Sequence, residues 1–304
     1  MFAPALSVDV EEWYHNCWIP EYVDPKRRPV LPEELDRLLP NLVEELAPFG
    51  ARATFFVLGE LAVRLAPRLR ALADAGHEIA CHGFHHFRAN DLAPREFLRE
   101  IRDAKALLED LTGAPVNGFR APEWSLRVPS NPRLRLVAEA GFVYDSSLVR
   151  ALWSGSTRNS DRPVRYAWPD GLDLIEVPPL TWGGRLRLPA SGWCGRAASP
   201  RWILRAVQDG QRSGRLPLLV VHPWELVDRP CPGLFTGLAR FFHEAGRVGF
   251  AEHFRTLLSS SRWRPIEAVL DDSLEKTRPD SPPLPLAAER PLAGLGWARG
   301  GVSR

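Results

Sequence analysis

Short apolar runs recur along the chain and alternate with longer segments of helical period. The runs that predict β-strands, all rich in aliphatic or aromatic residues, are 5–10, 53–57, 78–82, 117–121, 142–146, 174–180 and 218–221. The amphipathic segments that predict helices are 32–48, 60–75, 94–111, 200–211 and 238–258. Strands that alternate with helices of this length form a parallel sheet. The pattern therefore predicts an α/β fold whose seven strands make a closed or nearly closed β/α barrel.

Two long stretches, 149–172 and 181–199, lack a clear period and contain several tryptophans, which predicts loops over the mouth of the barrel. Indole rings stack on the apolar faces of pyranose rings, so these loops favour a sugar-binding cleft. The alternative is that the tryptophans pack the loops against the rest of the chain. A Pro-rich, charged tail at 271–304 predicts disorder, which leaves 1–270 as one domain.

The composition is that of an ordinary globular protein and argues against several function classes. The chain has 304 residues, 45% of them apolar, and its 39 basic and 37 acidic residues nearly balance. This balance gives no electrostatic reason to expect nucleic acid or a membrane surface as a partner. No apolar run approaches the roughly 20 residues of a spanning helix, and no secretory signal pattern is visible, so we expect a cytoplasmic protein without a transmembrane segment.

The cysteines support the same compartment. None of them has C-x-x-C spacing, which argues against a structural zinc site or a redox pair and fits reduced thiols in a cytosol; they are Cys17, Cys81, Cys194 and Cys231.

Ionisable residues gather at the ends of the predicted strands. From the first strand to the last, they are Asp9, Glu11, His82, His86, Arg120, Asp145 and His222. The C-terminal ends of parallel strands open onto one shared mouth, so we expect these side chains to meet there. This combination of carboxylates, imidazoles and an arginine predicts a metal-dependent active site.

The first strand offers two carboxylates. Side chains alternate along a strand, so Asp9 and Glu11 share a face, and Glu12 points away if strand geometry persists that far. Two such groups either solvate an exposed strand end or lie buried, where an acid must be paired or bind a metal. The apolar run before Asp9 favours the second interpretation.

The histidines supply nitrogen ligands. His82 and His86 are four residues apart, which on a helical turn places both imidazoles on one side, the spacing of bidentate zinc motifs. His85 is a competing ligand. Together with one carboxylate, the pair predicts a site of two nitrogens and one oxygen that leaves open positions for water.

Three further residues complete the expected mouth. Arg120 follows an apolar strand, where a guanidinium needs a partner, and Asp9 is the candidate that it would orient. Asp145 either joins the site or caps the following loop. His222 follows a buried apolar run and precedes Pro223, so it is either a hydrogen-bonded core histidine or a proton donor at the mouth; the strand-breaking proline favours the donor.

These residues resemble a known family, the polysaccharide deacetylases with the NodB homology domain. The motifs that carry the resemblance are His82-Gly-Phe-His-His86, Gly118-Phe-Arg-Ala-Pro122, Tyr144-Asp-Ser-Ser147 and His222-Pro-Trp-Glu225, within a match over roughly 6–266. As a set, they look most like the subgroup often encoded in bacterial exopolysaccharide gene clusters. The resemblance implies a distorted (β/α)7 barrel, a divalent metal that is usually zinc, with Co²⁺ or Ni²⁺ as alternatives, and hydrolysis of N-acetyl groups from a carbohydrate polymer or its precursor.

The resemblance also implies roles for individual residues. Asp9 becomes the catalytic base, His82 and His86 metal ligands, and His222 the general acid, while Arg120 orients the base. The chain departs from most of the family at Val10, where a second Asp is usual. Some members place the metal carboxylate one position later, which is Glu11 here.

Other interpretations remain open at this point. Glu12 is the alternative to Glu11 as the third ligand, and Asp145 is retained as a catalytic candidate. The same fold also suits hydrolysis of another small amide or ester, such as an O-acetyl, formyl or ureide group. A non-catalytic carbohydrate-binding relic is a third possibility, although a relic has no physical need to keep costly buried charges.

Overall fold

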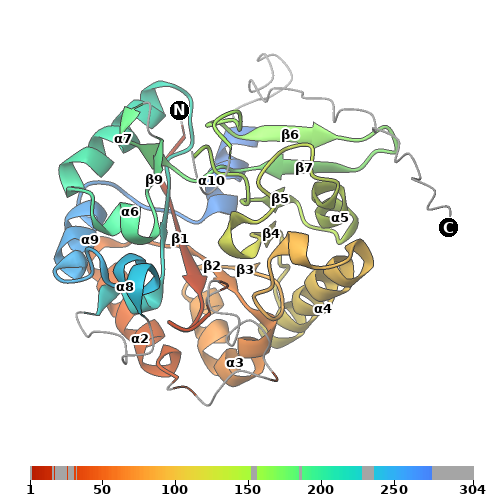
Figure 1. Cartoon of the computed structure of the whole chain (residues 1–304), viewed down its shortest axis with the longest axis horizontal. Coiled ribbons are helices and arrows are strands. Elements are labelled where there is room, and N and C mark those ends of the chain that lie inside the picture. The colour runs from red at the N-terminus through yellow and green to blue at the C-terminus, as the bar shows by residue number, and fades with distance from the viewer. Residues whose placement is uncertain are drawn as a thin grey trace, which may run out of the picture.

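A curled, mostly parallel sheet organises the molecule (Figure 1). The computed structural model describes residues 2–15, 17, 26, 31, 33–151, 156–184, 187–227 and 236–275. Eight strands pair in the order β10-β1-β2-β3-β4-β5-β7-β6, and each pairing is parallel except that of β6 with β7. Their bounds are β1 (Ala5–Val10), β2 (Thr54–Val57), β3 (Glu78–Cys81), β4 (Gly118–Phe119), β5 (Tyr144–Asp145), β6 (Val164–Ala167), β7 (Asp173–Glu176) and β10 (Leu218–Val221).

Helices surround this sheet and fill its amino end. They are α2 (Leu35–Leu46), α3 (Gly59–Asp74), α4 (Pro94–Thr112), α5 (Arg133–Glu139), α6 (Gly192–Arg196), α7 (Pro200–Arg212), α8 (Gly237–Glu244), α9 (Phe250–Leu258) and α10 (Ile266–Glu275), with 3-10 turns η1 (Ala47–Phe49), η2 (Ala89–Asp91), η3 (Pro122–Trp124) and η5 (Pro223–Leu226). No helix in the described part of the chain combines the length and the apolar composition needed to cross a bilayer.

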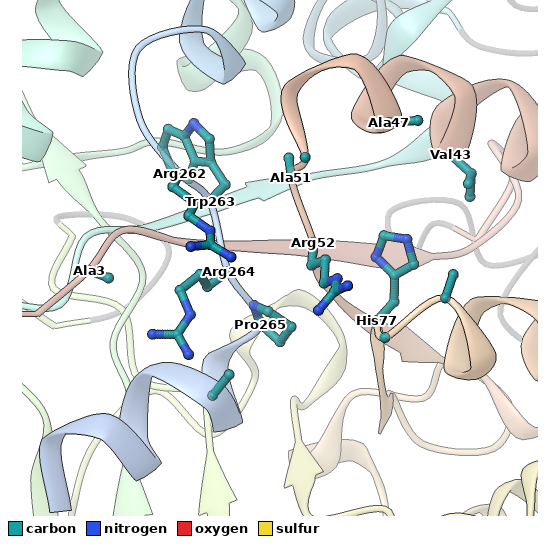
Figure 2. Close-up of a pocket in the computed structure, with 14 residues that line it drawn as sticks. Ala3, Val43, Ala47, Ala51, Arg52, His77, Arg262, Trp263, Arg264 and Pro265 are labelled. Carbon is teal, nitrogen blue, oxygen red and sulfur yellow. The ribbon is translucent and has the colours of Figure 1, made fainter. Parts of the chain in front are cut away.

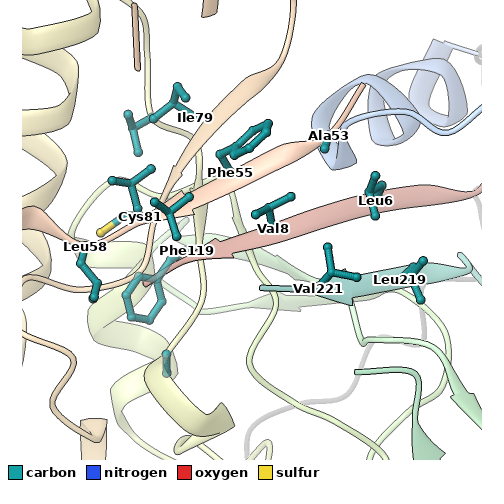
Figure 3. Close-up of a cluster of buried hydrophobic side chains, with 14 of the residues drawn as sticks. Leu6, Val8, Ala53, Phe55, Leu58, Ile79, Cys81, Phe119, Leu219 and Val221 are labelled. Atoms are coloured by element: carbon teal, nitrogen blue, oxygen red, sulfur yellow. The ribbon is translucent and has the colours of Figure 1, made fainter. Parts of the chain in front are cut away.

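The strand β1 shows why the sheet is buried on both faces. Its six residues are all buried, and they alternate between two cores. Leu6 and Val8 face the outer helices with Phe55 and Val221 (Figure 3). The alternate residues, Ser7 and Asp9, therefore face the inside of the curl. The inner face thus carries the polar side chains that a site at the mouth requires.

All seven predicted strands are present, although most are shorter than predicted. The predicted helix 238–258 is instead two helices, α8 and α9, because the chain turns at Gly246 and Gly249, whose φ angles are +72° and +78°. Such positive φ angles suit glycine and end a right-handed helix. The prediction of one continuous helix was therefore wrong.

The two stretches predicted as loops contain regular structure. The first includes β6, which pairs with β7, and the second includes the hairpin β8 (Thr181–Trp182) and β9 (Leu188–Pro189). The segment before the hairpin is hydrogen-bonded to the edge of β10 that faces away from β1, since the Leu180 N–H donates to the Leu218 carbonyl at 2.8 Å. At the other end of the chain, α10 continues to Glu275 and the rest of the predicted tail lies outside the described residues.

Candidate active site

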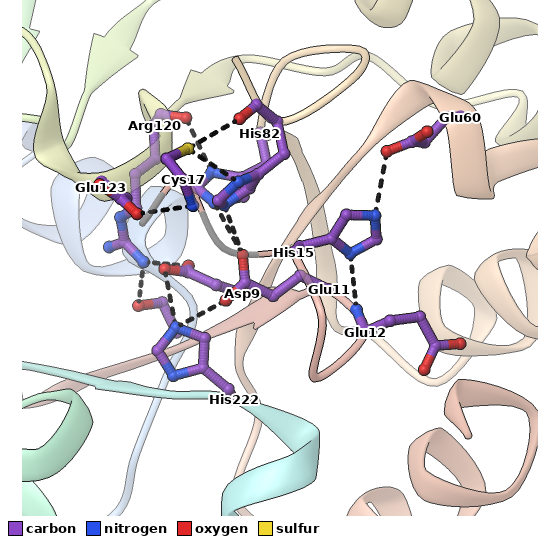
Figure 4. A network of polar contacts seen from close by, with 12 residues as sticks. Asp9, Glu11, Glu12, His15, Cys17, Glu60, His82, Arg120, Glu123 and His222 are labelled. Atoms are coloured by element: carbon purple, nitrogen blue, oxygen red, sulfur yellow. Dashed lines mark hydrogen bonds and ion pairs between the residues drawn. The ribbon is translucent and has the colours of Figure 1, made fainter. Parts of the chain in front are cut away.

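Four strands bring their carboxyl ends to one mouth, where the predicted residues other than Asp145 meet (Figure 4). Asp9 comes from β1 and Arg120 directly follows β4. The fully buried Arg120 donates from one terminal nitrogen to Asp9 Oδ1 at 2.5 Å and to Ser7 Oγ at 2.9 Å. Its other nitrogens donate to the carbonyl and the hydroxyl of Ser146 at 3.2 and 3.0 Å. The predicted pairing of Arg120 with Asp9 is thus present, and every arm of the guanidinium is fixed.

Glu11 lies between two imidazoles. Its Oε2 is 2.7 Å from His86 Nε2 and 3.8 Å from His82 Nε2. One ligand atom from each of the three buried residues fits within 4.8 Å of the others, as expected for groups that can hold a metal ion. His86 reaches this position because its backbone adopts a φ of +61°, after a turn through Gly83 at +86°.

A backbone carbonyl fixes the tautomer of His82. His82 Nδ1 lies 2.8 Å from the carbonyl oxygen of Arg120, which can only accept a hydrogen bond, so Nδ1 carries the proton. Nε2 then keeps its lone pair on the side of Glu11. This arrangement is the usual one for a metal-binding imidazole.

The charges of the cluster suit a cation. Burial raises the pKa of Glu11, but His86, His222 and His82 outweigh burial and lower that pKa to about 2. Burial lowers the pKa of His82 to about 4, against the pull of Asp9. At neutral pH the cluster therefore combines an anionic carboxylate with a neutral imidazole. Burial opposes the charged form of His86, yet Glu11 and Cys17 raise its pKa well above 6.5, so a proton supplies the positive charge there.

His222 approaches the carboxylates from the opposite side. Its Nε2 is 3.2 Å from Glu11 Oε1 and 3.9 Å from Asp9 Oδ2, and its Nδ1 is 3.1 Å from Glu225 Oε2. Burial disfavours the imidazolium, but Glu225, Glu11 and Asp9 together raise the pKa of His222 to about 9. A protonated imidazole thus faces the mouth, as a proton donor requires.

Glu225 is a site residue that our reading of the sequence did not single out. It is fully buried, contacts His222 and pairs with the buried Arg196 of α6. The signal was present in the spacing, because a carboxylate three residues after a histidine, across a Pro-initiated turn, can reach back to it. The backbone N–H of His222 indeed donates to Glu225 Oε2 at 2.9 Å.

Two competing ligands lie elsewhere. Glu12 accepts hydrogen bonds from the backbone N–H groups of Glu34 and Leu35 at 2.8 and 3.2 Å, and pairs with Arg64. His85 Nδ1 is 3.0 Å from Glu100 of α4. Neither belongs to the group of possible metal ligands in the described part of the chain.

Asp145 supports the mouth without lining it. Tyr144 and Ser146 face the inside of the curl, so strand alternation turns Asp145 to the other face. There its Oδ1 accepts from Ser147 Oγ at 2.6 Å, and Ser147 in turn accepts from the Ala121 N–H at 2.8 Å. Burial raises the pKa of Asp145 to about 6 beside the equally buried Glu176. The expected direct catalytic position is therefore not observed; Asp145 positions the segment after Arg120.

The turn η3 closes another side of the mouth. Glu123, which has a φ of +52°, accepts the backbone N–H of Cys17 at 3.1 Å and pairs with Arg88 at 2.6 Å. The N–H of Trp124 donates to the Ala121 carbonyl at 3.0 Å and is thereby engaged within the turn. The thiol of Cys17 lies 3.7 Å from His86 Nδ1. Sequence reasoning singled out neither the thiol of Cys17 nor the carboxylate of Glu123 as a site group, since neither residue lies at a strand end.

The predicted sugar-binding tryptophans contact the protein itself. Trp182 lies against Trp202 of α7 with ring centroids 5.4 Å apart, and Trp193 lies 5.3 Å from Phe242 of α8. Packing of the loops therefore accounts for at least part of their indole surface.

Comparison with known proteins extends these observations. Residues 32–144 match the family model described as polysaccharide deacetylase. A peptidoglycan deacetylase of Helicobacter pylori is 29% identical over 36% of this chain and 37% of its own length. A peptidoglycan deacetylase-like protein of Gibberella zeae is 32% identical over 32% of this chain and 28% of its own length. The matched region thus spans about a third of these curated relatives.

Solved structures extend the similarity to nearly the whole chain. A putative polysaccharide deacetylase from Mycobacterium smegmatis has a TM-score of 0.58 at 21% identity, covering 90% of this chain and 91% of that one. An allantoinase has a TM-score of 0.59 at 17% identity, covering 91% and 92%. These structures confirm the predicted NodB-type β/α barrel, at identities that speak for the fold alone. The family model and the curated relatives in turn show that part of this chain is similar to polysaccharide deacetylases.

Proposed function

We propose that this protein is a metal-dependent hydrolase that removes N-acetyl groups from amino sugars of a bacterial polysaccharide or of its precursor. The observation that carries the proposal is the position of Glu11, a buried carboxylate flanked by two ligand imidazoles and by the proton donor His222. Asp9, held by Arg120, lies in the same mouth. One site thus combines metal ligands, a base and an acid.

The donor set fits a divalent metal. Glu11, His82 and His86 supply one oxygen and two nitrogens within 4.8 Å of one another, and three protein ligands are usual for a catalytic zinc site that keeps an open position. Co²⁺ and Ni²⁺ accept the same ligands. When bound, such a metal polarises the amide carbonyl and activates the attacking water.

The chain's own residues move the protons. Asp9 accepts the proton of the attacking water. Arg120, whose terminal nitrogen also donates to Ser7, holds Oδ1 of Asp9, so that Oδ2 remains directed toward the mouth, 3.9 Å from His222. His222 donates its proton to the sugar nitrogen as the carbon–nitrogen bond breaks. The Glu123–Trp124 turn has two backbone N–H groups, and that of Trp124 already donates to the Ala121 carbonyl. We therefore assign the N–H of Glu123 to the developing oxyanion. Acetate and a free amino sugar leave.

The finer features of the proposal rest on the motifs. The His222-Pro-Trp-Glu225 turn, with its carboxylate behind the acid, supports the exopolysaccharide-associated subgroup. We place the reaction in the cytoplasm, on a precursor, where the free thiols of Cys17, Cys81 and Cys194 stay reduced. Because an allantoinase shares the fold, the barrel by itself does not choose among small amides. The intact set of buried charges disfavours a non-catalytic relic.

Two matched variants test the proposal. Divalent metal content by elemental mass spectrometry, and acetate release from N-acetylated amino-sugar oligomers, are measured for wild type, His82→Ala and Asp9→Asn. We expect about one metal ion per chain in wild type and Asp9→Asn and none in His82→Ala, with turnover of Asp9→Asn reduced by about 10²- to 10⁴-fold. Wild-type turnover in Asp9→Asn, or no metal in reconstituted wild type, would contradict the assignment.

A further inference from the structure

A second cavity lies away from the active site, beside the amino end of β10. It has a volume of about 780 Å³ and lies between β8, α7 and the segment that leads into β10. Among the residues that line it are Trp182, Trp202, Arg150, Arg187, Arg205 and Arg215. Arg215 precedes β10 and His222 follows it, so the cavity and the active site belong to opposite ends of the same strand.

The cavity carries an excess of positive charge. A single carboxylate, that of Asp161, faces three of the lining arginines, at 3.2 Å from Arg150, 2.9 Å from Arg187 and 3.5 Å from Arg215. One carboxylate cannot neutralise three guanidiniums. Arg205 adds a fourth, and the lining Asp209 is engaged with Arg212 at 3.6 Å. The cavity is therefore set to accept an anionic ligand.

Two buried donors in its wall need an acceptor. Trp182 Nε1 and Arg215 Nε are buried, and neither has a hydrogen-bond partner within the described part of the chain. A buried donor without a partner is unfavourable, because it has lost its hydrogen bond to water. Nearby, the indole of Trp202 is 56% exposed and tilted by 47° to that of Trp182. An aromatic face thus stands beside unsatisfied N–H groups.

A comparable cavity of about 810 Å³ at the amino end of the sheet is also lined by arginines, but its tryptophan, Trp263, is fully buried (Figure 2). Its Arg264 pairs with Asp272 at 2.5 Å, and His77 Nδ1 accepts the N–H of Ala53 at 3.2 Å. None of its lining residues is among the buried donors without a partner in the described residues. It therefore gives no comparable argument for a ligand.

We infer that the cavity beside β10 binds an acidic oligosaccharide through uronate-type carboxylates. The arginines pair with the carboxylates, and the exposed indole stacks on a pyranose face. The site would hold an anionic glycan chain at a distance from the mouth where deacetylation takes place. The choice of a saccharide rests on the proposed function; binding itself requires neither the metal cluster nor Asp9.

Calorimetric titration with tetragalacturonate tests the inference, because this probe has a carboxylate on every residue and no N-acetyl group. We expect wild type and His82→Ala to bind it alike, and Trp202→Ala and Arg205→Gln to bind at least about tenfold more weakly. The matched control is Arg201→Gln, an exposed arginine on the same helix outside the cavity, which should bind like wild type.

The inference would be overturned by unchanged binding of Trp202→Ala, by equal affinity for uncharged cellotetraose, or by a response to inorganic sulfate as strong as that to the saccharide. Loss of binding in His82→Ala would equally contradict it, since the cavity would then not be separate from the metal cluster. A failure of the proposed deacetylase activity would appear only in acetate release and would leave the wild-type titration unchanged, so the two outcomes are distinguishable.

Discussion

Arg120 links the proposed base, Asp9, to a proposed metal ligand, His82. Its guanidinium holds Asp9 at 2.5 Å, while its backbone carbonyl accepts from His82 Nδ1 at 2.8 Å. A shift of this one residue would therefore displace both groups. Two contacts restrict such a shift. The guanidinium carbon of Arg120 lies 4.0 Å from the centroid of the Phe56 ring, and the guanidinium donates hydrogen bonds to Ser146. The position of the base and the tautomer of the ligand thus have a common origin.

Glu225 should set the pH range of the general acid. Burial lowers the pKa of His222, but Glu225 is the strongest of the groups that raise it, to about 9. Glu225→Gln removes that charge and lowers the pKa of His222. Because the acid must be protonated to act, the alkaline limb of the kcat–pH profile should move to lower pH. Arg196 keeps the carbonyls of Ala245 and Phe242 as acceptors, so we expect the fold to remain.

The measurement is kcat against pH for wild type, Glu225→Gln and the control Glu244→Gln, a partly exposed carboxylate that pairs with Arg240. Glu244→Gln should retain the wild-type limb. Superimposable alkaline limbs for wild type and Glu225→Gln would disprove the role of Glu225.

Strand alternation explains which site residues the sequence could reveal. Asp9, His82, Arg120 and His222 follow or end apolar strands, so their positions at the mouth were predictable. Asp145 also ends a strand but lies on the opposite face, because Tyr144 and Ser146 occupy the inner one. The sequence alone does not say which face of so short a strand is inner. Cys17 contacts His86 only through the tertiary fold.

The turn after β1 directs two adjacent carboxylates, Glu11 and Glu12, toward different partners. Glu11 faces the histidines, whereas Glu12 receives two backbone N–H groups at the start of α2. His15 stabilises this turn, since its Nδ1 accepts the N–H of Glu12 at 2.8 Å. One short segment therefore fixes both a candidate ligand and the docking of a helix.

Alanine variants should separate these tasks. We expect Glu11→Ala to lose the metal, and Glu12→Ala to keep it while the free energy of unfolding, measured with chelator present, falls by about 1 kcal/mol or more. The loss reflects the unpaired N–H groups of α2 and the lost pairing with Arg64. Metal content and urea unfolding of both variants are the measurements. Metal loss in Glu12→Ala with unchanged stability would reverse the assignment.

Element prediction was limited by length and by glycines. The predicted strands and helices had enough residues for their period to be visible. The hairpin strands β8 and β9 have only two residues each, too few for alternation to give a signal. In 238–258 the apolar period continues across Gly246 and Gly249, so it concealed the break between α8 and α9. The tertiary contacts of β10 with the hairpin are not encoded in any local pattern.

The whole molecule has a polar network at each end of the curled sheet. The active site occupies the carboxyl end. At the amino end, the buried Glu78 of β3 accepts from Thr54 Oγ1 at 2.5 Å, from Tyr144 Oη at 2.7 Å and from the N–H of Glu267 at 3.1 Å. These contacts join β2, β3 and β5 to the start of α10. A single carboxyl group thus connects the closing helix to the inner face of the sheet.

Glu78 should make the stability of the molecule fall as pH rises. Burial raises its pKa from 4.5 to about 7, so the folded chain binds this proton more tightly than the unfolded chain does. The resulting stabilisation is complete below the unfolded pKa and is lost as pH rises through about 7; a shift of this size corresponds to about 3 kcal/mol.

The variant Glu78→Gln stays neutral at every pH. Between about pH 5 and 8 its free energy of unfolding should therefore fall by about 3 kcal/mol less than that of wild type. Urea unfolding across this range, with the exposed Glu252→Gln as control, measures the slope, and parallel curves for wild type and Glu78→Gln would show that the carboxyl group is not the source.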